Sequence, residues 1–213
     1  MFVHEAKEKI VTLRRHASPS FAPRNRPGLP SASATLRLVA VRPRPGDARQ
    51  GWLRAGERIL PCALGRGGVR VRKREGDGAT PTGTFTFREA FAPREPLAGV
   101  PVRQAALPFR TVGARDGWCD ASDDRNYNRA VSLPYGAGHE RLVRDDHLYD
   151  MVLVPDHNRA GLGRGLRARG SAVFVHLARP GYTPTEGCVA LSRAHMLWLW
   201  PRIGSRTRLR ITL

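Results

Sequence analysis

The chain has 213 residues, a length that suits one domain, with or without a tail, and that allows a sizeable core. Its formal net charge is +18, most of it from arginine, and such a charge favours polyanions: nucleic acid, an anionic membrane surface or an acidic polymer. The alternative is that a codon preference for arginine produces this charge, in which case the charge does not indicate a polyanionic partner. No basic helix with interleaved aromatic residues is present, which argues against a specific nucleic-acid reader, and no apolar run has the length of a transmembrane helix.

Residues 1–34 are predicted to form a basic, proline-rich N-terminal arm. Val3–Arg15 carries apolar residues at helical spacing, and residues 18–34 hold four prolines. We interpret the arm as a tail, and a segment that folds over an active site or docks a partner is the alternative. The first residues contain no apolar h-region, so they do not indicate an ordinary secretory signal.

Residues 35–213 are predicted to form the main domain, with a mainly β fold. Thr35–Val41 alternates between two faces and predicts a strand that opens a β-meander. Three glycines at residues 76–83 indicate a loop, which is read either as an ordinary hairpin or as a wall of a groove. Further strands are predicted at Trp52–Leu53, Arg58–Leu64, Val69–Lys73 and Thr84–Phe87.

Residues 92–147 contain few periodic segments. A structureless stretch of this length is uncommon in a compact domain unless it is functional. We therefore predict an irregular insertion that caps a groove. Trp118 and Tyr127 within it are interpreted as packing anchors, and a position beside an active site is the alternative.

The C-terminal third combines strands with the one helix that the pattern supports. Ser192 is a good N-cap for a buried helix over Arg193–Ile203, which Pro201 ends or kinks. Strands are predicted at Leu148–Pro155, Ala172–His176 and Thr207–Leu213. The first two of these are expected to pair around the loop between them, and the last closes the sheet.

The cysteines and aspartates give no sign of a metal site or a cofactor. No C-x-x-C pair is present, and the aspartates at positions 120, 123 and 124 lack the spacing of an EF-hand. An odd number of cysteines leaves at least one thiol free. We expect Cys188 to be free, and Cys62 and Cys119 to be two buried thiols, with a bridge between them as the alternative.

The stretch from residue 170 to residue 192 carries the residues for thiolate chemistry. This chemistry needs a sulfur, a nearby base and backbone N–H groups that hold an oxyanion. A strand ends on His176, and Cys188 follows Gly187 after a turn-rich loop. The glycine allows the backbone to approach a substrate carbonyl, and helix-forming sequence after Cys188 is expected to lower the pKa of the thiol.

The same stretch resembles the catalytic segment of the YkuD-type L,D-transpeptidases, which carry a His, a loop and then Ser/Thr-His-Gly-Cys. The matching residues are His176, Thr185, Gly187 and Cys188, and residues 76–85 resemble the Thr-Pro-x-Gly strand entry of that family. Glu186 stands where the family usually has His, and Ala190 where it usually has Arg or Asn. The resemblance covers roughly residues 35–213 and implies a β-sandwich or barrel with a helix after the cysteine.

The resemblance also implies roles for the site residues. Cys188 would be the nucleophile and His176 the general base, with its ring held by a backbone carbonyl because Leu177 has no polar side chain. The N–H groups of Gly187 and Cys188 would hold the oxyanion, Thr185 would bond a neighbouring backbone group, and Glu186 would make altered substrate contacts. Arg193 would hold a substrate carboxylate, with an ordinary surface arginine as the alternative.

The implied activity is cross-linking of peptidoglycan stem peptides by a monomer of the periplasm or cell envelope, through an acyl-enzyme on the cysteine. The acceptor would be the side-chain amine of diaminopimelate, and the cross-link 3-3 or 1-3. One alternative is a cysteine carboxypeptidase or endopeptidase that trims stems or releases a wall-linked protein. Another is a basic protein that binds a polyanion. Because no secretory signal is visible, the cytoplasm is the alternative location.

Overall fold

The structure, a computed structural model, describes residues 35–94, 106–158 and 169–213. The arm predicted over residues 1–34 therefore lies outside the described residues, as do parts of the predicted insertion and of the loop that follows residue 156. The described residues belong to one compact unit. Within the described ranges, no helix combines the length and the apolar character needed to cross a bilayer.

The chain starts as the predicted β-meander. Strands β1 (Leu38–Arg44), β2 (Asp47–Ala55) and β3 (Arg58–Ala63) pair antiparallel in order, with Val41 opposite Leu53 and Leu53 opposite Leu60. Alternation places Val39, Val41 and Leu53 on the buried side, where each is fully shielded from solvent.

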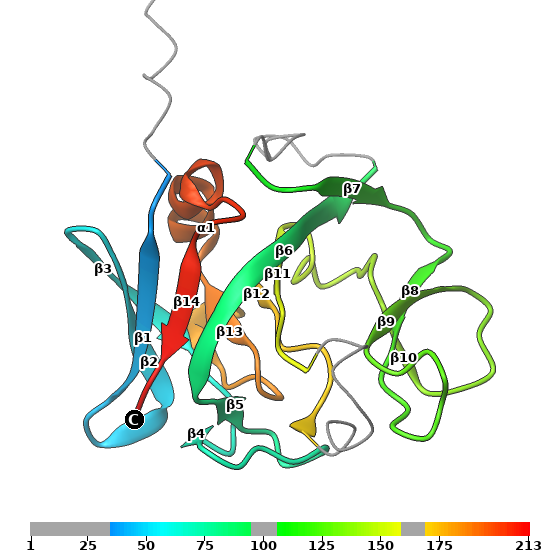
Figure 1. Ribbon diagram of the computed structural model, residues 1–213, viewed down its shortest axis with the longest axis horizontal. Coiled ribbons are helices and arrows are strands. Elements are labelled where there is room, and N and C mark those ends of the chain that lie inside the picture. Colours follow the sequence, from blue (N-terminus) through cyan, green and yellow to red (C-terminus); the bar gives the residue numbers. More distant parts are fainter. Residues whose placement is uncertain (1–34, 95–105, 159–168) are drawn as a thin grey trace, which may run out of the picture. The chain divides into compact units, whose positions relative to one another are not determined.

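The sheet curls until its two ends meet, and this gives the barrel-like core. The order is β11-β12-β13-β3-β2-β1-β14-β6-β7, and β6 also pairs with β11. Figure 1 shows β6 running across the molecule between β14 and β7. The remaining strands of this sheet are β6 (Gly83–Pro93), β7 (Phe109–Val112), β11 (Val152–Pro155), β12 (Val175–Leu177), β13 (Val189–Leu191) and β14 (Arg208–Ile211).

Two predictions about pairing are confirmed. Strand β11 pairs antiparallel with β12 through Leu153 and Val175, and β14 closes the sheet between β1 and β6. The strands are shorter than predicted at several places. In particular, the basic strand expected at Val69–Lys73 is reduced to β4 (Val69–Arg70), which pairs with β5 (Thr80–Pro81).

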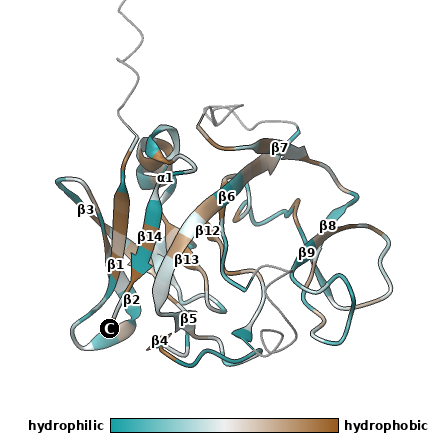
Figure 2. Ribbon diagram, in the orientation of Figure 1, coloured by the Kyte–Doolittle hydropathy of each residue, from teal (hydrophilic) through white to brown (hydrophobic). Residues whose placement is uncertain are grey.

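Helix α1 (Arg193–Leu199) follows β13, as predicted. The Ser192 hydroxyl accepts a hydrogen bond from the backbone N–H of His195, which makes it the N-cap. The α-helix changes at Trp200 into the 3-10 helix η3 (Trp200–Arg202), which contains Pro201. Met196 and Leu199 are fully buried against the barrel, and Figure 2 shows apolar residues in brown along β1 and in part of α1.

The prediction of an irregular insertion was wrong in one respect. The described part of residues 92–147 contains β7 and a small antiparallel sheet with the order β10-β8-β9. Its strands are β8 (Asp116–Cys119), β9 (Arg129–Ser132) and β10 (His139–Arg141). They are too short for a periodic pattern to be visible, and cross-strand pairing stabilises them instead.

A second apolar cluster joins this small sheet to the barrel. Phe174 lies at its centre, with Trp118 edge-on at 5.1 Å and Phe91 edge-on at 5.8 Å. Trp118 is thus a packing anchor, and its indole N–H donates to Asn128. Cys62, Cys119 and Cys188 are all free and buried, so the expectation of a free Cys188 and two further buried thiols is confirmed.

Candidate active site

Strand alternation brings His176 and Cys188 to the same side of the sheet. Strands β12 and β13 run parallel, with Val175 opposite Val189 and His176 opposite Ala190. Val175 and Val189 pack into the barrel. Because side chains alternate along an extended chain, the adjacent His176 and Cys188 face away from it. His176 and Cys188 therefore both line a cavity of about 410 Å³ on the side of the small sheet.

The Cys188 sulfur is held by backbone groups of the segment that leads into β12. The N–H of Phe174 donates to Sγ at 3.3 Å, and the thiol donates to the carbonyl of Ala172 at 3.0 Å. Burial, with the nearby Glu140 carboxylate second, raises the pKa of the Cys188 thiol to about 12. The expectation of a lowered pKa was wrong, because Cys188 is followed by strand β13 rather than by a helix N-terminus.

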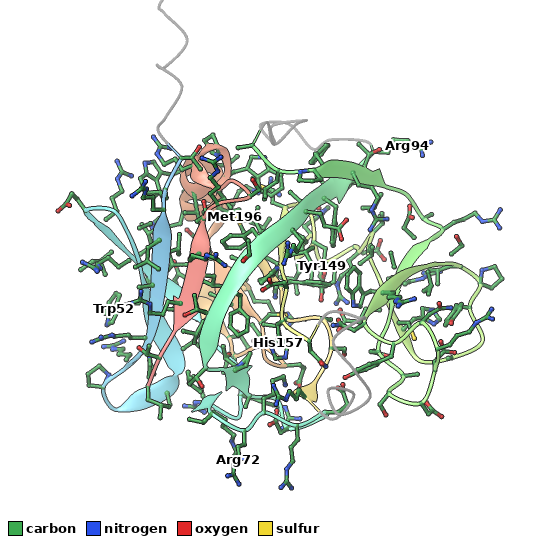
Figure 3. The ribbon with its side chains drawn as sticks, viewed as in Figure 1. Trp52, Arg72, Arg94, Tyr149, His157 and Met196 are labelled. Atoms are coloured by element: carbon green, nitrogen blue, oxygen red, sulfur yellow. The ribbon has the colours of Figure 1, made fainter. Side chains whose placement is uncertain are left out.

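His176 is buried and its ring is oriented by a backbone carbonyl, as expected. Nδ1 lies 2.8 Å from the carbonyl oxygen of Leu177. Because a carbonyl only accepts, Nδ1 carries the proton and Nε2 has the free lone pair. Burial lowers the pKa of the imidazole to about 4. The ring also has Tyr149 edge-on at 5.2 Å, and Figure 3 shows Tyr149 inside the fold.

The turn before Cys188 is bridged by the hydroxyl of Thr185. This oxygen accepts from the N–H of Gly187 at 3.1 Å and donates to the carbonyl of Cys188 at 2.7 Å. The backbone contact expected of Thr185 is therefore present. The same contact engages the N–H of Gly187, which was expected to be free for an oxyanion. Among the described residues, no acceptor is bonded to the N–H of Cys188.

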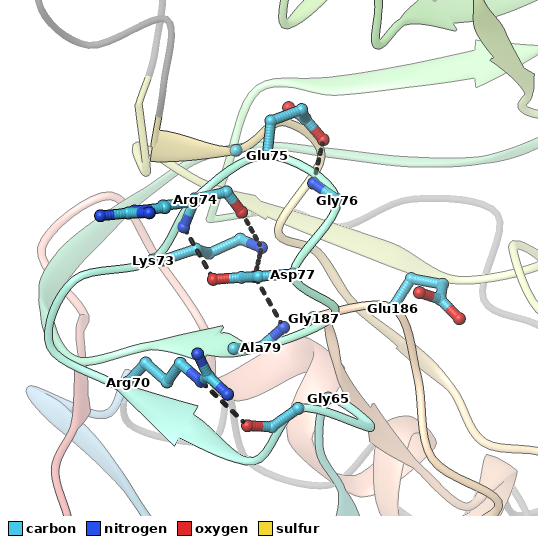
Figure 4. Close-up of polar contacts among 12 residues, drawn as sticks. Gly65, Arg70, Lys73, Arg74, Glu75, Gly76, Asp77, Ala79, Glu186 and Gly187 are labelled. Carbon is cyan, nitrogen blue, oxygen red and sulfur yellow. Dashed lines mark hydrogen bonds and ion pairs between the residues drawn. The ribbon is translucent and has the colours of Figure 1, made fainter.

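The position of Gly187 has no room for a side chain. Its φ is +133°, and a Cβ there would lie 2.8 Å from the carbonyl oxygen of Ala79. Ala79 belongs to the glycine loop, so this loop and the cysteine turn are in direct contact, as Figure 4 shows around Asp77 and Gly187. Gly76 and Gly78 line the cavity, and the loop is therefore one of its walls.

Glu186 lies at the exposed rim of the cavity. Its side chain is 74% exposed and pairs with Arg66 at 2.8 Å. Arg66 also donates its backbone N–H to the carbonyl of Thr185, and this ties β3 to the turn. A surface ion pair of this kind contributes about 0–1 kcal/mol, so it shapes the rim more than it stabilises the fold.

The structure does not bring Arg193 to the cavity. Its guanidinium donates to Asp150 at 2.6 Å, and it is not among the residues that line the cavity. Asp150 is buried and needs a counter-charge, which fixes Arg193 on the first turn of α1. The role in binding a substrate carboxylate that the sequence suggested for Arg193 is therefore corrected.

The cavity is also lined by charged residues to which the sequence had assigned no role in the site. The basic ones are Lys73, Arg144 and Arg179, and the acidic ones are Glu75, Asp120 and Glu140, in addition to Glu186. They come from the glycine loop, the small sheet and the loop after β12, so spacing along the chain does not group them. Lys73 lies just before residues 76–85, which match a family motif. This closeness in sequence was the one signal that could have pointed to Lys73 as a residue of the site.

Asn128 connects the small sheet to the strand that holds the cysteine. Its Oδ1 accepts from the indole of Trp118 at 3.1 Å and from the N–H of Ala172 at 3.0 Å. Its Nδ2 donates to the carbonyls of His157 and Asn158. Since the carbonyl of Ala172 is the acceptor for the Cys188 thiol, Asn128 positions the residue that orients the sulfur.

A buried thiol and a neutral imidazole share one cavity, and a glycine loop forms one of its walls. In the described ranges, no three His, Cys, Asp or Glu side chains are grouped as metal ligands. The family model of the YkuD L,D-transpeptidase catalytic domain matches residues 44–211. The chain belongs to this family.

Solved structures of L,D-transpeptidases are similar to this chain. One from Mycobacterium smegmatis is 17% identical with a TM-score of 0.36, and the match covers 83% of this chain and 58% of that one. L,D-transpeptidase 3 from Mycobacterium tuberculosis, in complex with a faropenem-derived adduct, is 13% identical with a TM-score of 0.37 and coverages of 82% and 60%. This chain thus spans less than two thirds of these proteins. No curated protein matches the chain.

Proposed function

We propose that this protein is a peptidoglycan L,D-transpeptidase with Cys188 as its nucleophile and His176 as its general base. The observation that carries the proposal is the cavity that both side chains line. The free Nε2 of His176 accepts the proton of the Cys188 thiol as sulfur attacks. Membership of the YkuD family supplies the class of substrate, a stem peptide of the cell wall.

The proposed reaction has two steps. Sulfur bonds to the carbonyl carbon at the L-centre of diaminopimelate, the C–N bond to D-alanine breaks, and His176 returns its proton to the departing amine. The product is a thioester. The neutral side-chain amine of a second stem then attacks the thioester, the C–S bond breaks, and a cross-link and the free thiol result.

In this proposal the pair is assembled only when substrate binds. The thiol donates to Ala172, and in the described part of the chain no hydrogen bond joins Sγ to the imidazole. Catalytic hydrogen bonds are often long before substrate binds. Rotation of the Cys188 side chain away from Ala172 would direct the thiol to Nε2, and this rotation is part of the proposal.

The proposed location follows from the proposed substrate. Peptidoglycan lies in the cell envelope, so we place the protein in the periplasm or cell envelope. We further propose that it acts as a monomer. Residues 35–213 would be the catalytic domain. Glu186 would contact the substrate at the rim, since it stands beside the glycine–cysteine pair and lines the cavity.

Incubation of the purified protein with a disaccharide-tetrapeptide tests the proposal. Mass spectrometry should show a cross-linked dimer, released D-alanine and a thioester on Cys188, all of which Cys188→Ala removes. Shortened stems without dimers would instead indicate the hydrolase, and salt-sensitive binding to DNA without turnover would indicate the polyanion binder. Absence of products together with absence of a carbapenem adduct on Cys188 would contradict the proposal.

A further inference from the structure

Lys73 is a buried lysine at the wall of the cavity. Its side chain is only 5% exposed, and its ammonium lies 3.0 Å from Asp77 Oδ1 and 3.5 Å from the carbonyl oxygen of Arg74. Lysine is almost never fully buried unless it is paired, because removing the ammonium from water costs several kcal/mol. Figure 4 shows Lys73 between Arg74 and Asp77.

The ammonium of Lys73 lies against the backbone of the two segments that hold the cysteine. A Cβ at Gly170 would lie 3.0 Å from Nζ, and a Cβ at Gly187 would lie 3.3 Å from it. Gly170 precedes the strand whose carbonyl accepts from the thiol, and Gly187 precedes Cys188. Both glycines have positive φ, so their missing side chains leave the space that Nζ occupies.

Lys73 has a donor to spare. A lysine ammonium has three N–H donors, and the described residues provide two acceptors, Asp77 and the carbonyl of Arg74. Asp77 is itself shared, because its oxygens also accept the backbone N–H groups of Arg74 and Ala79. One N–H of Lys73 therefore remains for a group in the cavity that Lys73 lines.

Lys73 is a candidate for the second oxyanion donor of the site. The N–H of Gly187 is bonded to Thr185, which leaves the N–H of Cys188. Arg144 and Arg179 also line the cavity, but both pair with Asp146. Lys73 is therefore the basic residue of the cavity whose charge lies closest to the backbone of the cysteine turn.

We propose that Lys73 is the electrostatic partner of Cys188, whose thiolate and tetrahedral oxyanion its ammonium stabilises. This rests on the proposed role of Cys188 as the nucleophile. As the S–C bond forms and the thiol proton moves to His176, the carbonyl π electrons pass to oxygen. The oxyanion then accepts from the N–H of Cys188 and from Lys73, which keeps its proton throughout.

The charges around the thiol agree with this role. Burial is the main cause that raises the pKa of Cys188, Glu140 and Glu186 raise it further, and Lys73 lowers it. Tyr149 and His176 line the same cavity, as do the charged groups Glu75, Asp120, Arg144 and Arg179. Around Lys73, the titratable neighbours are Asp77 and His157.

Alkylation of the full chain with iodoacetamide between pH 7 and pH 10, followed by peptide mapping, tests the proposal without any cell-wall substrate. Lys73→Met should slow the labelling of Cys188 about tenfold at each pH, equivalent to a pKa about one unit higher. Lys73→Arg should restore most of the rate. Arg72→Met is the matched control, because Arg72 is exposed, belongs to the same loop and points outward in Figure 3.

Asp77→Asn gives a prediction of opposite sign. It removes the counter-charge of Lys73 and keeps the ammonium, so Cys188 labelling should become faster. Labelling of the buried Cys62 and Cys119 reports unfolding in any variant, and if Lys73→Met unfolds, the Asp77→Asn result decides. Unchanged Cys188 rates in folded Lys73→Met, or an unchanged or slower rate in Asp77→Asn, would overturn the proposal. A wild-type Cys188 that resists labelling throughout would instead contradict the nucleophile itself.

Discussion

Among the described residues two histidines are buried, His157 and His176, and their surroundings differ. Burial lowers the pKa of both His176 and His157 to about 4, but only His176 lines the cavity with Cys188. Nε2 of His157 lies 3.0 Å from the carbonyl oxygen of Arg169, so this nitrogen is not free to accept a proton. A buried imidazole thus becomes a candidate base only where its second nitrogen faces a reacting group.

We predict that His176→Ala lowers the rate of acyl-enzyme formation at Cys188 by a factor of about 10² to 10⁴, which is typical for the loss of a general base. The measurement is the mass of the carbapenem adduct over time. His157→Ala, corrected for its folded fraction, should react at the wild-type rate. Equal losses in the two variants would show that the effect is structural.

As the proposed base, His176 also sets a pH limit for the reaction. Because the neutral imidazole is the active form and its pKa is lowered to about 4, activity should persist on acidification through pH 6.5. The rate should fall only near pH 4, in a profile of kcat/KM measured with the tetrapeptide. A midpoint near 6.5, the value of an exposed histidine, would contradict the buried geometry.

Thr185 gives a sharper test of the cysteine turn. Its hydroxyl bonds both the N–H of Gly187 and the carbonyl of Cys188. Thr185→Val keeps the shape and removes both bonds, and we expect about a tenfold loss of kcat with a smaller change in KM. Thr185→Ser retains the hydroxyl and should stay within about twofold of wild type. A Val variant as active as the Ser variant would exclude a role for the bridge.

At the scale of elements, the small sheet and the segment that leads into β12, the strand of His176, depend on each other. The described contacts between them include the aromatic cluster around Phe174 and the hydrogen bond that the N–H of Ala172 donates to Oδ1 of Asn128. Asn128 itself has a φ of +57°, which asparagine tolerates better than most residues. Asn128 therefore links by a hydrogen bond the same two parts of the protein that the Phe174 cluster links by apolar packing.

We predict that Asn128→Ala destabilises the protein by about 3 kcal/mol, because it leaves buried donors and acceptors without partners. The free energy of unfolding in urea measures this cost. Asn126→Ala is the matched control: Asn126 is half-buried and its amide bonds the hydroxyl of Tyr135 at 2.8 Å. Its loss should cost less than about 1 kcal/mol, and an equal cost for both variants would contradict the special position of Asn128.

At the scale of the whole molecule, the buried histidines make stability depend on pH. In the unfolded chain each histidine binds a proton near pH 6.5, whereas folded His157 and His176 do so only near pH 4. Between these values the unfolded state binds more protons, so stability falls as pH falls. The carboxylate of Asp146 is paired with Arg144 and its pKa is lowered to about 2. The stability that its charge contributes is therefore lost only at pH values below this window.

We predict a loss of about 3 kcal/mol per buried histidine between pH 6.5 and pH 4, from 1.36 kcal/mol per pKa unit. Urea unfolding at several pH values measures the slope. His157→Gln should reduce the slope by about half, since one of the two groups is removed. A slope that does not change in this variant would show that other groups cause the acid sensitivity.

The sequence by itself determined what depends on local pattern. Alternating residues predicted the meander, the closing strand and the core strands around His176, and the Ser192 cap and Pro201 predicted the helix and its change at Trp200. The motif residues Thr185, Gly187 and Cys188 marked the cysteine turn, because a short turn with a required glycine leaves a signal in adjacent positions.

Only the tertiary structure decided what surrounds the thiol. The small sheet was not visible in the sequence, since strands of three or four residues have no period to detect. The pKa of Cys188 is raised rather than lowered because the residue lies between two packed layers and precedes a strand. Lys73 reaches the cysteine turn, and Arg193 does not, because long-range contacts rather than spacing along the chain set which charges meet at the cavity.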